Sequence, residues 1–170
     1  MLKNLTLQAL FFIGIFMLVS WFREMSLLPT NGEYLVPAAE LVTLDNKPIN
    51  LKDFQGKPAL LYFWAPWCSV CKMSMPNLQQ FYQTQQSKPE HERIQVIAIA
   101  LSYESTQEVT EYIQERKYQF TALLGNNLTL EAFKIQGFPT YYLMDENGYL
   151  TSKSLGYSTE LGMNLRSLTL

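Results

Sequence analysis

The hydrophobic positions of this chain alternate between short, nearly uninterrupted apolar runs and stretches in which apolar residues recur at helical spacing. The runs at 60–64 and 94–101 are apolar enough to predict strands buried on both faces. Shorter or alternating runs predict further strands at 39–44, 49–51, 120–124, 141–144 and 149–155. The turn residues Asp145 to Gly148 lie between the last two and predict a β-hairpin.

Four segments have the spacing of helices. The first begins at the only two cysteines, Cys68 and Cys71, and continues to about residue 83, with a kink expected at Pro76 because proline donates no backbone hydrogen bond. The others are predicted at 105–116, 128–133 and 158–168, the last with Ser158 as its N-terminal cap.

This order predicts an α/β domain. Strands that alternate with helices favour a parallel central sheet covered on both faces, and the hairpin adds an antiparallel edge. Active sites in such sheets lie at the carboxyl ends of strands, and Cys68 directly follows the strand predicted at 60–64.

The N-terminal segment differs from the rest of the chain. From Asn4 to Phe22 it has no charged residue, and these 19 residues would span roughly 28 Å as a helix, close to the ~30 Å hydrocarbon core of a bilayer. We predict a transmembrane anchor at 1–24, a tether at 25–36 and a folded domain at 37–170. A cleaved signal peptide is the alternative, but no A-x-A-like pattern of small residues follows the apolar run.

The charges that flank this segment indicate its orientation only weakly. Lys3 and the α-amino group precede it and Arg23 follows it, a slight bias toward a cytoplasmic N-terminus. We therefore expect a single-pass protein of the inner (cytoplasmic) membrane, with residues 4–22 in the lipid bilayer and the domain on the periplasmic or extracytoplasmic side.

Composition narrows the class of function. The chain has 170 residues, of which 48% are hydrophobic, and this is sufficient for a packed core. The net charge of −2 and the lack of a Lys/Arg cluster argue against nucleic acid as a partner.

The two cysteines are the main candidates for chemistry. Their spacing on the first turn of a helix allows a disulfide, and the helix dipole favours a thiolate at the first position, as thiol–disulfide exchange requires. A purely structural disulfide would close a very small loop and stabilise little. Zinc would need two further ligands, and the only histidine is His91, in a polar stretch. Copper(I) could use Met73 and Met75, but a helix would point them to different sides.

The residues 64–72, WAPWCSVCK, resemble the WAxWCxxCK signature of the thioredoxin superfamily, and 137–140, GFPT, resemble its Gly-x-Pro-Thr loop. The resemblance covers roughly 41–168 and implies a thioredoxin fold. It implies that Cys68 is the attacking cysteine and Cys71 the resolving one, so that the redox-active disulfide replaces any cofactor or metal. The supporting site residues that it implies are Pro66, Trp67, Pro76, Phe138 and Pro139, with Pro139 in a cis peptide and the Phe138 backbone binding the partner chain.

An N-terminal hairpin at 41–58 is similar to that of the membrane-anchored TlpA/ResA-like subgroup. Members that reduce apocytochrome c usually carry glutamates where this chain has Ser74 and Thr140, and thioredoxin has an aspartate where this chain has Tyr62. Val70 within the cysteine motif and the segment 156–166 resemble most closely the ScsD-type disulfide oxidoreductases, a group named for suppression of copper sensitivity.

These features predict a membrane-anchored enzyme that exchanges disulfides with extracytoplasmic proteins and acts more as a reductant than as an oxidant. We expect a monomer whose partners are protein thiols and disulfides and a membrane thiol protein that donates electrons. A thiol reductase for cytochrome c maturation and a non-enzymatic copper(I)-binding module remain alternatives.

Overall fold

The computed structural model describes residues 8, 11, 12, 14, 15, 18, 19 and 24–170. Those described before residue 20 are helical. No helix within the described residues is long and apolar enough to cross a bilayer. The anchor predicted at 1–24 lies largely outside the described residues, so it stays a prediction.

A single seven-stranded sheet forms the centre of the domain, with the strand order β2-β1-β5-β4-β3-β6-β7. The strands are β1 (Glu40–Thr43), β2 (Pro48–Asn50), β3 (Ala59–Trp64), β4 (Gln95–Ala100), β5 (Thr121–Leu124), β6 (Thr140–Met144) and β7 (Leu150–Leu155). The neighbours β3, β4 and β5 pair in parallel, while β1–β2, β1–β5, β3–β6 and β6–β7 are antiparallel. The predicted mixed sheet and its hairpin edge are confirmed.

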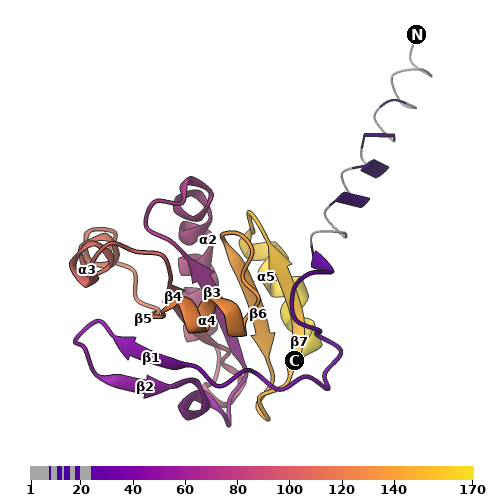
Figure 1. Ribbon diagram of the computed structural model, residues 1–170. Helices are drawn as coiled ribbons and strands as arrows, with labels where there is room; N and C mark the ends of the chain where they lie inside the picture. The colour runs from indigo at the N-terminus through magenta and orange to yellow at the C-terminus, as the bar shows by residue number, and fades with distance from the viewer. Residues whose placement is uncertain (1–7, 9–10, 13, 16–17, 20–23) are drawn as a thin grey trace.

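Helices cover both faces of this sheet (Figure 1). They are α2 (Ser69–Gln86), α3 (Thr106–Glu115), α4 (Asn127–Ala132) and α5 (Glu160–Arg166), with 3₁₀ turns η1 (Leu51–Phe54), η2 (Glu90–Glu92) and η3 (Ser167–Thr169). Because side chains alternate along a strand, β3 contributes to two hydrophobic cores, one on each face of the sheet. Tyr62 and Trp64 pack with α2, α3 and α5, whereas Leu61 and Phe63 pack with the end of α4 and the chain before β1.

The last helix begins later than expected. Thr159, and not Ser158, is the N-terminal cap: its hydroxyl accepts a hydrogen bond from the backbone N–H of Gly162 at 3.1 Å. Ser158 lies just before the helix: its hydroxyl donates to the carbonyl of Gly156 at 3.4 Å, and its backbone N–H and C=O bond to Ser74 on α2. The prediction at this position was wrong, since a contact 84 residues away in sequence decides it.

The stretch predicted as a tether, 25–36, packs onto the domain. Leu28 is completely buried, and its N–H donates to the hydroxyl of Tyr142 at 3.2 Å. The N–H groups of Gly32 and Val36 donate to backbone carbonyls of Leu150 and Gly148. The segment therefore follows the β7 side of the sheet, and the domain boundaries proposed from the sequence stay a prediction.

Candidate active site

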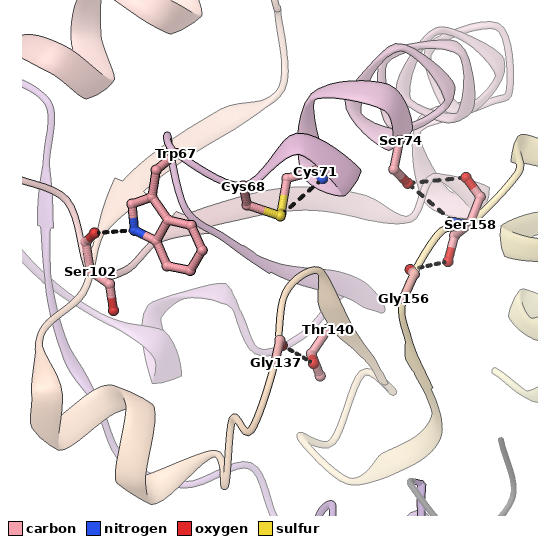
Figure 2. Close-up of a disulfide and its surroundings, with 9 residues drawn as sticks. All are labelled: Trp67, Cys68, Cys71, Ser74, Ser102, Gly137, Thr140, Gly156 and Ser158. Carbon is pink, nitrogen blue, oxygen red and sulfur yellow. Dashed lines mark hydrogen bonds between the residues drawn. A yellow bond between two sulfur atoms is a disulfide. The ribbon is translucent and has the colours of Figure 1, made fainter. Parts of the chain in front are cut away.

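The two cysteines lie at the carboxyl end of β3, where the chain turns into α2. Cys68 caps the helix: its Sγ accepts the backbone N–H of Cys71 at 3.0 Å. The two residues form a disulfide with their Cα atoms 5.2 Å apart (Figure 2). A sulfur at this position receives both a helix N–H and the positive end of the helix dipole, which favours a thiolate when the bond is reduced.

The two cysteines differ in their exposure to solvent. Cys68 is 6% exposed, whereas Cys71 is completely buried in the core beneath α2. Thiol–disulfide exchange needs direct approach of one sulfur to another. An external disulfide can therefore reach Cys68, while Cys71 can react only with a group already bound at Cys68.

Trp67 lies directly before the cysteines and is 61% exposed. Its indole Nε1–H donates to the backbone carbonyl of Ser102 at 2.8 Å, so the loop after β4 holds the ring in place (Figure 2). Ser102 has a positive φ of 51°. The exposed ring is thus a fixed apolar surface beside the disulfide.

Phe138 brings a distant segment to the same place. Its ring centre lies 5.7 Å from that of Trp67, with the planes at 77°, an edge-to-face contact. The peptide between Phe138 and Pro139 is cis, as the family resemblance implies. The carbonyl of Pro139 accepts the N–H of Gly156 at 2.8 Å, and Thr140 Oγ1 donates to the carbonyl of Gly137 at 2.8 Å.

The two prolines named from the signature have different surroundings. Pro66 is buried and lines a surface hollow of about 410 Å³ between the start of α2 and α3, together with Lys72, Tyr112 and Arg116. Pro76 is exposed and lies inside α2, which continues through it to Gln86.

Residues 74 and 62, at which the family resemblance implies acids in other members, carry hydroxyl groups here. Ser74 Oγ donates to the carbonyl of Ser158 at 3.1 Å and accepts its N–H at 3.2 Å (Figure 2). Tyr62 is completely buried, and burial raises the pKa of its hydroxyl, an effect that the nearby Ser74 hydroxyl partly offsets. Neither position therefore supplies an ionised carboxylate to the disulfide.

Metal binding gains no support from the described part of the chain, in which no three His, Cys, Asp or Glu side chains are grouped so as to hold an ion. Met73 is 60% exposed and Met75 is completely buried, so the two thioethers point to different sides of α2 as expected.

Of the residues predicted from the sequence, the structure brings Cys68, Cys71, Trp67, Phe138 and Pro139 to one end of the sheet. The prediction missed Ser102 and gave Ser158 the role of a helix cap. Here their backbone atoms bond to Trp67 and Ser74, respectively. No side-chain pattern could have identified the carbonyl of Ser102. Ser158 lies in the 156–166 segment that the subgroup resemblance had singled out.

Comparison with known proteins identifies the family of this chain. The model of the AhpC/TSA family matches residues 34–153. The chain belongs to the AhpC/TSA family. Within it, the chain is 27% identical over 126 residues to thiol-disulfide oxidoreductase ResA of Bacillus cereus, a match that covers 73% of this chain and 69% of the relative. It is 26% identical over 144 residues to sporulation thiol-disulfide oxidoreductase A of Bacillus subtilis, covering 84% and 85%.

Solved structures agree on the fold of this AhpC/TSA family member. The crystal structure of StoA from Bacillus subtilis superposes with a TM-score of 0.64 at 23% identity, covering 84% of this chain and all of that one. The thioredoxin domain of a thiol-disulfide oxidoreductase from Bacteroides vulgatus gives 0.70 at 24% identity, covering 84% and 99%. The fold is that of thioredoxin, and the chain is a thioredoxin-like thiol–disulfide oxidoreductase with a Cys68–Cys71 pair.

Proposed function

We propose that this enzyme reduces or rearranges disulfides of extracytoplasmic proteins while anchored to the cytoplasmic membrane through residues 4–22. The observation that carries the proposal is the pairing of a reachable Cys68 with a buried Cys71 at the start of α2. That arrangement supports a directional two-step exchange, and an exported domain meets protein disulfides to exchange.

The reaction begins with the reduced enzyme. The Cys68 thiolate attacks one sulfur of a substrate disulfide, which forms a mixed disulfide and releases the other substrate sulfur as a thiolate that takes up a proton. Cys71 then loses its proton and attacks Cys68 Sγ. This step releases the second substrate thiol and forms the Cys68–Cys71 disulfide, so two electrons pass from enzyme to substrate. A membrane dithiol protein restores the reduced pair by the same exchange in reverse.

Trp67 and Phe138 provide the surface on which a substrate chain would lie. Their edge-to-face contact makes a rigid apolar rim next to Cys68, and the exposed Trp67 ring offers area at a low cost in side-chain entropy. The Phe138 backbone, held by the turn before β6, would align the extended partner chain.

The direction of electron flow is proposed from the residues between the cysteines. Ser69 and Val70 include no histidine that would stabilise a thiolate at Cys68, as strong oxidants often have, and this favours a reductant. Each 30 mV of potential corresponds to about 1.4 kcal/mol for a two-electron couple. A measured potential above roughly −150 mV, near the DsbA end of the scale, would refute a reductant role.

We further propose that the protein is of the ScsD type and takes part in copper tolerance. Both proposals are supported by Val70 and by the 156–166 segment, in which Ser158 contacts the active-site helix at Ser74. The hydroxyls of Ser74 and Thr140 at the usual glutamate positions weigh against cytochrome c maturation. The separation of Met73 from Met75 weighs against a copper(I) carrier.

A trapping experiment in the native membrane tests the exchange reaction. Full-length Cys71→Ala should accumulate mixed disulfides through Cys68 that disappear on reduction, and mass spectrometry identifies the partners. Cys68→Ala/Cys71→Ala is the matched control and should trap nothing. Equal adducts from both variants, or none from either, would contradict the proposal. Stoichiometric copper(I) binding by the reduced chain without disulfide exchange would instead support the copper module.

A further inference from the structure

The C-terminal helix exposes an unusually apolar surface. Leu161, Leu165 and Leu168 are 67%, 59% and 80% exposed, although each is a large hydrophobic side chain. Their spacing of four and three residues puts them on one side of α5 and η3. Met163, on the opposite side, is completely buried in the core. We call Leu161, Leu165 and Leu168 the α5 leucine face.

This surface lies on the helix that contacts Glu24, a residue that follows the apolar N-terminal segment in the sequence. Arg166 of α5 forms an ion pair with Glu24 at 3.7 Å. Phe22, the last residue of the uncharged stretch, is two residues before Glu24. Only Arg23 separates this stretch from Glu24 in the sequence. A bilayer that holds residues 4–22 would therefore begin next to α5.

The chain after Glu24 leaves little freedom between that segment and the domain. Leu27 donates its N–H to the carbonyl of Glu24 at 3.2 Å, and Leu28 is completely buried. Lys153 Nζ on β7 donates to the carbonyl of Leu28 at 3.0 Å. Figure 1 shows the indigo stretch after residue 24 running beside yellow β7. The chain from Glu24 to Leu28 is thus held against the domain on the β7 side.

We propose that the α5 leucine face lies in the interfacial region of the bilayer that anchors the chain, an inference that rests on the membrane anchoring in the proposed function. Interfacial helices bury an apolar face at the boundary between headgroups and acyl chains, and leucine is typical of that face. The leucine face is therefore an apolar surface on the side of the domain where the chain would enter the bilayer.

The contact would also orient the active site. Ser158, just before α5, holds Ser74 on the helix that carries the cysteines through two hydrogen bonds. α5 and α2 pack in the same core through Met163 and Met75. With the α5 leucine face held at the bilayer surface, the distance of Cys68 from the membrane is fixed. The direction from which partners can approach Cys68 is fixed as well.

Depth-dependent fluorescence quenching tests the contact. Full-length chain carrying Trp21→Phe is reconstituted into vesicles of phosphatidylethanolamine and phosphatidylglycerol, with or without acyl chains brominated near the headgroups. Leu165→Trp is compared with Leu128→Trp, a leucine that is 74% exposed on α4. Both variants keep Trp64 and Trp67, so the difference between them reports the added side chain. We expect brominated lipid to cause a loss of emission for Leu165→Trp and none beyond the background for Leu128→Trp.

A vesicle flotation assay distinguishes a failure of the membrane anchor from a failure of the leucine contact. If the chain floats with the vesicles but Leu165→Trp is not quenched, the leucine face does not lie in lipid and the anchor stands. If the chain does not float, both the anchor and the leucine contact are overturned. Equal quenching of the two variants also overturns the inference, because it indicates a domain without a preferred orientation. Leu161→Trp replaces Leu165→Trp if the latter loses its unfolding transition or its disulfide exchange.

Discussion

Ser74 and Ser158 form a reciprocal pair of hydrogen bonds, in which one hydroxyl donates to the carbonyl and accepts from the N–H of the same residue, at 3.1 and 3.2 Å. Both residues are buried. The pair fastens the active-site helix to the chain just before α5, at the position where the family resemblance implies a glutamate in members that reduce apocytochrome c. In this protein the position is structural.

Ser74→Ala should lower the free energy of unfolding by about 1–3 kcal/mol, because it leaves the buried N–H of Ser158 without its acceptor, although the Ser158 carbonyl keeps its hydrogen bond from Asn77 at 2.9 Å. Denaturant titration of the oxidised chain measures the change. Ser87→Ala, at the exposed end of the same helix, is the control and should change it by no more than about 0.5 kcal/mol. Equal effects from the two variants would show that the pair contributes nothing specific.

Alkylation of the reduced enzyme should distinguish the two cysteines. Cys68 is reachable and accepts the N–H of Cys71, while Cys71 is completely buried. We expect iodoacetamide to label Cys68 first, because alkylation needs direct access to the sulfur. Peptide mapping by mass spectrometry reads the site. Preferential labelling of Cys71 would reverse the proposed order of attack.

Trp67→Ala should slow the reduction of a folded protein disulfide roughly 2- to 10-fold, the equivalent of about 0.5–1.5 kcal/mol for a lost aromatic contact. A small-molecule disulfide does not need the rim that Trp67 forms with Phe138, so its rate should change less. Stopped-flow kinetics with both substrates gives the ratio.

Two further variants control this measurement. Trp67→Phe keeps an aromatic ring beside Phe138 and should retain most of the preference for protein substrate. Leu128→Ala, another exposed apolar residue, should leave both rates unchanged. A uniform loss with large and small substrates would mean that Trp67 acts on the cysteines and not on binding.

Stability at alkaline pH should depend on Tyr142. Its buried hydroxyl donates to the carbonyl of Phe133 at 2.8 Å and accepts the N–H of Leu28. Burial raises the pKa of Tyr142 to about 12. Because the folded state prefers the protonated form, this stabilisation is fully present below about pH 10, the unfolded value, and is lost as the pH rises through 12.

Tyr142→Phe should therefore unfold more easily at neutral pH, by about 1–3 kcal/mol, but lose less stability between pH 10 and 12 than the parent chain. Denaturant titrations across this range give both quantities. Tyr157→Phe removes an exposed tyrosine and should follow the parent curve. Parallel curves for Tyr142→Phe and the parent would contradict the link between this hydroxyl and the alkaline transition.

Much of the architecture could be predicted from local patterns. The apolar runs identified β3 and β4, and helical spacing identified α3, whose buried residues are Val109, Tyr112 and Ile113. Ser158 was misassigned as a cap because a serine before a helix has the same local pattern whether or not its backbone is used elsewhere. The packing of 25–36 was missed for a related reason: Pro, Asn and Gly indicate a loop but not the surface on which it lies.

The sequence by itself determined the pair of cysteines, their place at the start of a helix after a buried strand, and the signature that identifies their chemistry, because spacing and local propensity express all three. Only the tertiary structure decided which sulfur can be reached and how Trp67 is fixed by the carbonyl of Ser102. It also decided that Ser74 is joined to Ser158 and that α5 lies beside Glu24. These relationships join segments far apart in the chain through burial and backbone hydrogen bonds, which no single stretch of sequence records.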